Sequence, residues 1–357
     1  MSLLAHGKTL LQRACVACPP LADLYYCFSG AFRHEHRTAL AGRIAHRRAR
    51  QRARDAASTD ALFYTLRRNT HRLEKGLIMR PRRAVFASGY IGETVDCFAR
   101  LFHDADLGVE RLRLQHDWSR AVLDAYFAAV DGTDPQIDAE RAAYRAALGT
   151  GAAAPIEGHI PSARGIAEPV VDIATFEAMA WRRRSVRWYQ QRPVERALVE
   201  RALLAAALAP SACNRQPFRF AAYDDPATIR IIAGITGGGK GFHEQIPGLL
   251  VVVGQLRACA AERDRHVPYI DAALASMGMC FAMEAQGLGT CCMNWPNSPS
   301  NERAIRRLVP LAVDEVVIML IAYGHPDPAG LVPYSQKKGT QELCAWNEVL
   351  TGGGTTS

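Results

Sequence analysis

Four arginines and one serine fall within six residues in the segment 182–187, which reads RRRSVR. Guanidinium groups bind phosphate through forked, charge-assisted hydrogen bonds, and a serine hydroxyl adds a neutral donor. The segment therefore predicts a compact anion site. A solvated basic turn is the alternative that this segment alone leaves open.

A second polar cluster occupies residues 209–218, which read APSACNRQPF. Pro210 ends a predicted helix and Pro217 leads into a predicted strand. The serine, asparagine and glutamine side chains between them can offer paired donors and acceptors to a planar heterocycle with carbonyl and imide edges. The alternative interpretation is a capped loop.

Two further segments could approach a ligand. Residues 287–296 read GLGTCCMNWP, a glycine turn followed by an extended piece, and small residues there let the backbone come close to a ligand. Residues 323–326 read YGHP and are followed by SQKK at 335–338, where a lysine could reach a phosphate. A solvated tail is the other interpretation of the basic pair.

The elements that must hold these segments change character along the chain. Before residue 149 apolar residues recur near helical spacing, and helices are predicted at 33–54, 61–77, 90–102 and 109–130. After residue 169, helices alternate with apolar runs typical of buried strands. The predicted elements there are helices 195–209 and 268–286 and strands 218–223, 249–253 and 313–323. This order favours a layered α/β or α+β core.

The segment 149–169 is rich in Gly, Ala and Pro, which predicts a linker. We therefore predict a mostly helical N-terminal domain over residues 1–165 that ends in this linker. A second domain is expected at 170–345, and a flexible tail at 346–357. The basic excess belongs to the first part, because residues 1–165 hold 24 Lys and Arg against 17 Asp and Glu.

The composition, with 49% hydrophobic and 22% charged residues, is that of a soluble globular protein. No apolar run is long enough for a membrane span, and the start lacks a signal-peptide layout, so a cytoplasmic protein is expected. The basic run at 33–54 has little aromatic interleaving, which argues against nucleic-acid binding and favours a surface or partner-docking helix. Cys15, Cys18 and Cys27 lack a fourth ligand at a familiar spacing, so no metal site is expected.

The four polar segments, in this order and over about 160 residues, resemble the nitroreductase family of flavoproteins. RRSVRWY is similar to the family's opening RRSxRxF, and APSACNRQPFRF to its APSxxNxQP loop. GLGTCCMN resembles its GLG turn, and YGHP with SQKK resembles its closing GxP and basic segment. The resemblance covers residues of about 170–345 and leaves the helical N-terminal extension unrecognised.

The resemblance implies an α+β fold, with helices flanking a mixed, mainly antiparallel sheet. It also implies a homodimer that binds FMN at the subunit interface. NAD(P)H would reduce the flavin and leave, and a small organic acceptor such as a nitroaromatic or a quinone would then take its place, in a ping-pong sequence. The cofactor carries the chemistry, while the protein supplies binding, orientation and electrostatics. No catalytic side chain is implied.

Cofactor-binding residues follow from the resemblance position by position. Arg183, Arg184, Ser185 and Arg187 would hold the FMN phosphate and ribityl chain. Pro210, Ser211, Ala212 and Asn214 would contact the flavin from the partner subunit. Cys292, Met293 and Asn294 would pass its N5 edge and offer a backbone N–H, and Lys337 would lie near the phosphate. His243 is aligned less clearly with a position that faces the flavin.

The sequence departs from the family pattern at two places. Asn294-Trp295-Pro296-Asn297 is bulkier than the usual small residues after the GLG turn, and we expect Trp295 to fill space rather than stack on a substrate. Lys337 replaces an arginine and offers a point charge instead of a fork. Cys213, Cys291 and Cys292 lie near the predicted flavin without a base beside them, which argues against a nucleophile.

The role of residues 1–165 stays open. The cluster 70–76, THRLEKG, places His71 and Lys75 on one helical face, which favours a solvated face with local ion pairs. A sharper hypothesis is that the helical domain covers the mouth of the flavin site and shapes the substrate pocket. The alternative to an enzyme is a flavin-binding accessory protein with this domain as its docking module.

Overall fold

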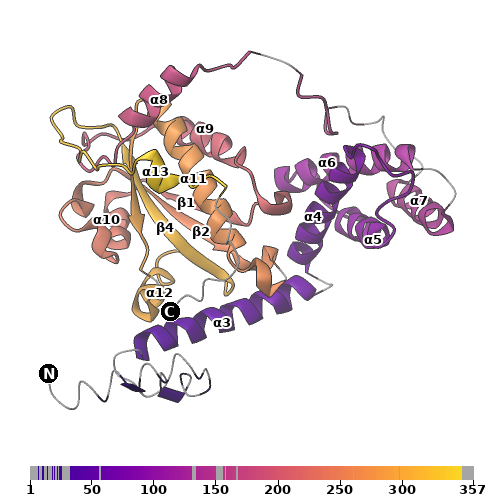
Figure 1. Cartoon of the computed structure of the whole chain (residues 1–357), viewed down its shortest axis with the longest axis horizontal. Coiled ribbons are helices and arrows are strands. Elements are labelled where there is room, and N and C mark those ends of the chain that lie inside the picture. The colour runs from indigo at the N-terminus through magenta and orange to yellow at the C-terminus, as the bar shows by residue number, and fades with distance from the viewer. Residues whose placement is uncertain are drawn as a thin grey trace.

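The structure is a computed structural model that describes residues 33–55, 58–130, 134–149, 158–165, 168–259, 261–296 and 298–347, residue 156, and isolated residues before 26 (Figure 1). Its α-helices are α3 (Arg33–Arg54), α4 (Thr59–Leu77), α5 (Ile91–Phe102), α6 (Glu110–Ala129), α7 (Pro135–Leu148), α8 (Ile173–Arg182), α9 (Arg196–Ala207), α10 (Pro226–Gly234), α11 (Val267–Ala285), α12 (Pro299–Ile305) and α13 (Thr340–Leu343). Its strands are β1 (Phe218–Tyr223), β2 (Gly248–Gln255), β3 (Gly289–Asn294) and β4 (Glu315–Gly324). Short 3-10 turns include η1 (Ala212–Asn214), η3 (His243–Gln245) and η4 (Leu256–Ala258).

Helices α4 to α7, called the helical unit below, pack around one apolar core. Ser58 begins α4 by accepting a hydrogen bond from the backbone N–H of Ala61, as an N-cap residue does. Leu66 and Leu73 lie two turns apart on α4 and are fully buried against Phe98 of α5 and residues of α6. The helices predicted at 61–77, 90–102 and 109–130 are confirmed to within two residues at each end. The sequence analysis did not predict α7 and α8.

The second part contains a four-stranded sheet in the order β1-β2-β4-β3, with every neighbouring pair antiparallel. Ser185 adds a parallel bridge to Thr290 at the outer edge of β3. The α+β class and the mixed, mainly antiparallel sheet predicted from the sequence are therefore confirmed. The predicted strands at 218–223, 249–253 and 313–323 correspond to β1, β2 and β4.

Helices cover both faces of the sheet, which explains why β2 is apolar throughout. Side chains alternate along a strand, so Leu249 and Val251 enter the core beneath α10, which Ile229 and Ile232 also form. Leu250 on the opposite face enters a second core with α9 and α11. Figure 1 shows α9 and α11 together on one face of the sheet.

Helix α3 is a surface helix, as predicted, with most of its described side chains exposed or half-buried, and it also packs within the same chain. It runs beside the end of the sheet and packs on η4 and α12 of the same chain (Figure 1). Ala49 is buried in this contact. The arginine-rich composition suggested solvent, but a stripe of small residues on one face lets the helix dock. Among the described residues, no helix is long and apolar enough to cross a membrane.

Candidate cofactor site

The arginine segment lies where α8 ends and the chain joins the edge of the sheet. Ser185 bridges to Thr290, and Val186 donates its backbone N–H to the Thr290 carbonyl at 3.0 Å. Arg182 is paired with Glu284 of α11 at 3.1 Å. The segment is thus fixed between β3 and α11 rather than forming a solvated turn.

The next three arginines have no ion pair with any described carboxylate. The Arg184 guanidinium lies over the Trp181 ring, 4.3 Å from its centroid. Arg187 is half-buried and donates to the Ser185 carbonyl at 3.4 Å. Arg183 is half-buried too, and its Nε atom is buried without a hydrogen-bond partner among the described residues. An unsatisfied buried donor is costly, so this cluster fits an anion such as a phosphate.

A thiol pair lies beside Arg183. The Sγ atoms of Cys280 on α11 and Cys292 on β3 are 3.9 Å apart. The hydrogen bond from Cys292 lowers the pKa of the Cys280 thiol to about 7 against the opposing effect of burial, with help from Thr290 and the Arg183 charge. The pair therefore favours ionisation of the Cys280 thiol over that of Cys292, a feature that was not predicted from the sequence.

Successive side chains of β3 point to opposite faces of the sheet, and this decides which of them are accessible. Cys292 and Asn294 are exposed, whereas Met293 is buried in the core. Met293 therefore offers a ligand only its backbone. Trp295 is buried as well, and its Nε1 donates to Glu302 at 3.2 Å, so the expectation that it fills space is confirmed.

The loop after α9 satisfies most of its own polar groups. The Ser211 hydroxyl donates to Asp271 at 2.6 Å and accepts the backbone N–H of Gln216 at 2.8 Å. The Gln216 amide donates to the Asn214 side chain at 3.1 Å. Ser211, predicted to face a heterocycle, is thus engaged by α11 and by the loop, and the Asn214 side-chain oxygen is engaged within the loop.

The backbone of this loop is unusual. Cys213, Asn214 and Gln216 all have positive φ, at 54°, 49° and 48°. Non-glycine residues adopt this region at a cost, and such strain collects at functional sites. Much of the loop backbone is hydrogen-bonded as well, because the Ala212 N–H donates to Asp271 and the Asn214 carbonyl accepts from Arg67.

Helix α11 separates the loop from the arginine cluster. The loop is bonded to Asp271 near the start of α11, and Arg182 is paired with Glu284 near its end. Thirteen residues of helix rise about 20 Å. One chain therefore does not bring its two predicted sets of cofactor residues together.

The C-terminal segment approaches the arginine cluster. The Tyr334 ring contacts the Trp181 ring, with the ring centroids 6.1 Å apart, and the Arg184 guanidinium lies over the same Trp181 ring. Lys337, three residues on, is exposed and has no ion pair with a described residue. His243 in η3 is half-buried against Gly239, and its Nδ1 has no described hydrogen-bond partner.

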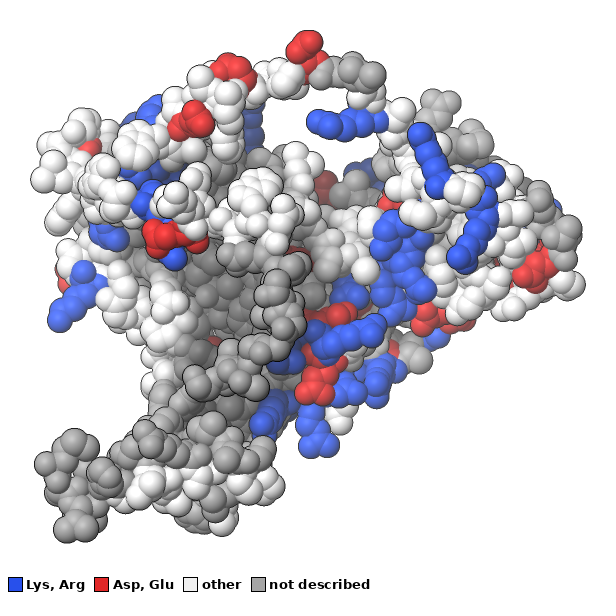
Figure 2. Space-filling view, viewed as in Figure 1, with Lys and Arg blue, Asp and Glu red and all other residues white. Residues whose placement is uncertain are grey.

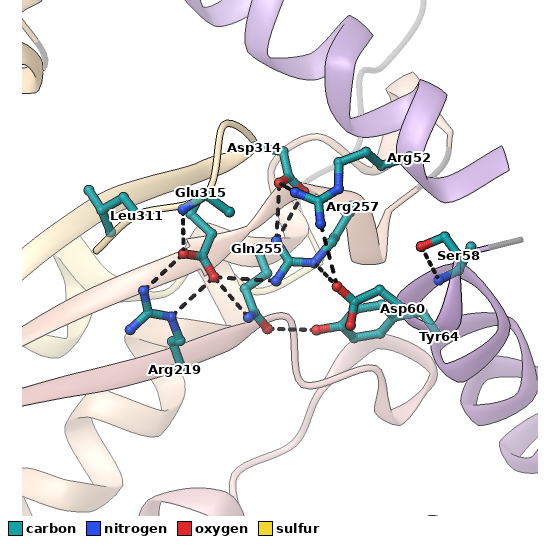
Figure 3. Close-up of polar contacts among 12 residues, drawn as sticks. Arg52, Ser58, Asp60, Tyr64, Arg219, Gln255, Arg257, Leu311, Asp314 and Glu315 are labelled. Carbon is teal, nitrogen blue, oxygen red and sulfur yellow. Dashed lines mark hydrogen bonds and ion pairs between the residues drawn. The ribbon is translucent and has the colours of Figure 1, made fainter. Parts of the chain in front are cut away.

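Sequence reasoning missed a network of charges that attaches α3 and the helical unit to the sheet (Figure 3). The Arg257 guanidinium after β2 contacts Asp60 of α4 at 3.0 Å and Asp314 at 3.1 Å. Arg52 of α3 also contacts the fully buried Asp314, at 2.8 Å. Figure 2 shows Lys and Arg side chains, with acidic ones among them, gathered where α3 approaches α4.

The same network includes Glu315 at the start of β4 (Figure 3). Its carboxylate accepts a forked pair of bonds from Arg219 at 2.9 and 3.1 Å and one from Gln255 at 3.1 Å. Burial acts to raise the pKa of Glu315, but these bonds and the Ala312 N–H outweigh it and lower the pKa to about 2. Gln255 in turn accepts the Tyr64 hydroxyl of α4 at 2.6 Å.

Other predictions for residues before 166 have mixed outcomes. His71 pairs locally with Glu74 at 3.1 Å, as a solvated face with local ion pairs predicts. Cys15 and Cys27 lie outside the described residues, as do parts of 149–169 and residues 348–357 of the tail. No group of three His, Cys, Asp or Glu side chains that could hold a metal occurs in the part of the chain that the structure describes.

Comparison with known proteins agrees with the resemblance. Residues 180–238 and 236–325 match the model of the Nitroreductase family. An NADH dehydrogenase of Thermus thermophilus is 28% identical over 193 residues, covering 45% of this chain and 90% of the relative. A candidate NADH dehydrogenase/NAD(P)H nitroreductase of Archaeoglobus fulgidus is 26% identical over 152 residues, covering 42% of this chain and 83% of the relative. An FMN-dependent nitroreductase structure from Clostridium difficile has a TM-score of 0.42 at 22% identity and covers 48% of this chain and 98% of its own.

Proposed function

We propose that the protein is an FMN-dependent oxidoreductase that uses NAD(P)H to reduce a small organic acceptor, since residues 180–238 and 236–325 match the model of the Nitroreductase family. The observation that carries the proposal is the cluster of Arg183, Arg184 and Arg187, none of which has a described carboxylate partner. A buried, unpaired guanidinium nitrogen is explained by an anionic ligand.

In this proposal Arg183 and Arg187 bind the FMN phosphate with Ser185, and Lys337 adds a point charge from the C-terminal segment. Arg184 is held by Trp181 and is oriented toward the same group. When bound, FMN would accept a hydride from NAD(P)H and pass two electrons to the acceptor, in a ping-pong sequence. The exposed edge of β3 at Cys292 and Asn294 would supply a backbone N–H to the flavin.

The proposed assembly is a homodimer with FMN at the subunit interface. Its support is the separation of the loop residues from the arginine cluster by about 20 Å of α11. In a dimer, Pro210, Ser211, Ala212 and Asn214 of one subunit would complete the site of the other. In this proposal the Asn214 amide NH2, which has no bond to a described residue, would face the partner's flavin, while Ser211 would hold the loop through Asp271.

The test begins with the full chain, purified and titrated with FMN while its visible flavin spectrum is recorded. Arg183→Met should weaken FMN binding at least about tenfold, since a charge-assisted bond contributes roughly 1.5–3 kcal/mol. Arg201→Met is the matched control, because Arg201 is exposed on α9 and distant in sequence from the cluster.

The outcomes separate the proposal from its alternative. Bleaching of the bound flavin by NADPH or NADH supports the enzyme. A protein that binds FMN but oxidises neither nucleotide would be the accessory protein instead. A colourless protein that takes up no FMN, or an Arg183→Met variant that binds it as tightly as wild type, overturns the assignment of the arginine cluster.

A further inference from the structure

Helix α4 crosses the strained loop 212–216 and leaves a cavity of about 720 Å³ between the helical unit and the sheet. Its wall comes from both parts of the chain. Aromatic rings contribute from the helical unit (Phe63, Tyr64 and Trp118) and from β1 (Phe218). Charged and amide side chains complete the wall, so the cavity offers both ring faces and polar groups to a small molecule.

Arg67 is the unusual side chain of this wall. Its Nε donates to the Asn214 carbonyl at 2.5 Å and its Nη1 to Gln115 at 3.0 Å. The guanidinium lies 5.4 Å from the Trp118 ring centroid and 5.9 Å from that of Phe63. Two of its five N–H groups are thus used, and three have no bond to a described residue.

Arg67 also lacks a counter-ion among the described residues. Burial lowers the pKa of its guanidinium to about 10, and no carboxylate contributes to offset the effect. A cation in such a position is stabilised by an anionic partner. The unused N–H groups supply the geometry that an anion requires.

Each of the other arginines of the wall has a carboxylate partner. Arg111 pairs with Asp60 at 3.1 Å, Arg215 with Asp264 at 3.0 Å, and Arg219 with Glu315 at 2.9 Å. Arg67 is therefore the arginine of this wall that has no carboxylate partner among the described residues. The acid of the wall, Glu110, is exposed at the start of α6 and makes no ion pair with a described residue.

We propose that this cavity binds a small planar aromatic carboxylate, with the free N–H groups of Arg67 on the carboxylate and the Trp118 and Phe63 rings against the aromatic body. A guanidinium fork matches a carboxylate, and offset aromatic contacts favour a planar ligand. The site lies beside the loop 211–216 but does not use the arginine cluster at 183–187. Its occupancy therefore does not depend on the proposed flavin.

A ligand bound in this cavity would affect the loop 211–216 through Arg67. The residue that receives the carboxylate also holds the Asn214 carbonyl, and Asn214 has positive φ. A ligand on Arg67 would thus contact the group that fixes the strained loop. If the loop contacts the flavin, as the proposed function holds, the aromatic acid is placed next to the reaction.

The experiment titrates 4-nitrobenzoate into the full chain by isothermal calorimetry, with and without saturating FMN. Without FMN the wild-type protein should bind one equivalent, and with FMN it should keep this site at the same affinity beside any second equivalent bound at the flavin. The neutral 4-nitrobenzyl alcohol should bind at least about tenfold more weakly, and inorganic phosphate more weakly still. This comparison requires no variant and so does not depend on how a variant folds.

Variants then locate the site. Arg67→Met should weaken 4-nitrobenzoate binding at least about tenfold, while Arg67→Lys, which keeps the charge, should lose less. Arg145→Met is the control, because it removes the same charge from an exposed position on α7. Circular dichroism checks that each variant keeps its helix content.

The proposal is overturned if 4-nitrobenzoate does not bind, if the alcohol binds equally well, or if Arg67→Met retains the wild-type affinity. If phosphate binds as tightly as 4-nitrobenzoate, the inferred contact of the Trp118 and Phe63 rings with an aromatic ligand is wrong. Displacement of the probe by FMN would assign the cavity to the flavin. Failure of the protein to bind FMN leaves the flavin-free titration intact, so the two proposals fail separately.

Discussion

One substitution, at Glu315, can measure how much the buried charge network contributes to the free energy of unfolding. Both of its carboxylate oxygens are occupied, by Arg219, Gln255 and the Ala312 N–H. Glu315→Gln keeps the shape of the side chain but removes the charge. It also places an NH2 group where donors already point.

The magnitude follows from the pKa of Glu315, which falls from 4.5 to about 2 in the folded protein. Each pKa unit corresponds to about 1.36 kcal/mol, so the ionised form gains about 3 kcal/mol of stability. Because the folded pKa is the lower one, this gain is complete well above pH 4.5 and is lost as the pH falls toward 2. The glutamine variant cannot show this loss.

Urea unfolding followed by far-UV circular dichroism measures the difference. At pH 7 Glu315→Gln should unfold with about 3 kcal/mol less free energy than wild type, and the deficit should shrink between about pH 4.5 and pH 3. Glu177→Gln, on an exposed part of α8, is the control and should change stability by no more than about 0.5 kcal/mol. Equal stability of Glu315→Gln and wild type at pH 7, or a deficit independent of pH, refutes the reasoning.

Two further changes test packing and thiol chemistry. Gly248→Ala should cost about 1–3 kcal/mol in urea unfolding, because a Cβ there overlaps the Tyr323 ring, whereas Gly237→Ala, with nothing within 4 Å, serves as control; equal costs would contradict this. An ultraviolet titration should show one thiolate that forms at a lower pH than an ordinary thiol, and this step should disappear in Cys280→Ala and move to higher pH in Cys292→Ala. A titration unchanged by Cys292→Ala would contradict the proposed hydrogen bond.

Local patterns predicted the elements where burial and periodicity coincide. The bounds of strand β1 and helix α3 were predicted to the residue. Both could be predicted because an apolar run or a helical period is visible in consecutive residues of the sequence. Helices α7 and α10 were missed although each begins with an Asp-Pro pair, Asp134-Pro135 and Asp225-Pro226. An N-cap aspartate followed by proline at the first helical position is a start signal that could have found both.

The candidate site was predictable only where its residues are contiguous. The arginines at 182–187 could be found from the sequence because four basic residues lie within six positions. The engagement of Ser211 by Asp271, 60 residues away, could not, since nothing local selects that partner. The pair of Arg52 with Asp314 spans 262 residues and depends wholly on tertiary packing.

The buried charges around Asp314 have a consequence for how the polypeptide can be divided. The helical unit and α3 meet the sheet on one side of the molecule, while the connection through residues 158–165 runs along the other (Figure 1). Covalent continuity in that connection is therefore not what keeps the parts together. Two fragments, separated within 158–165 and expressed together, should assemble into one particle. Such a divided protein would allow either half to be isotopically labelled alone.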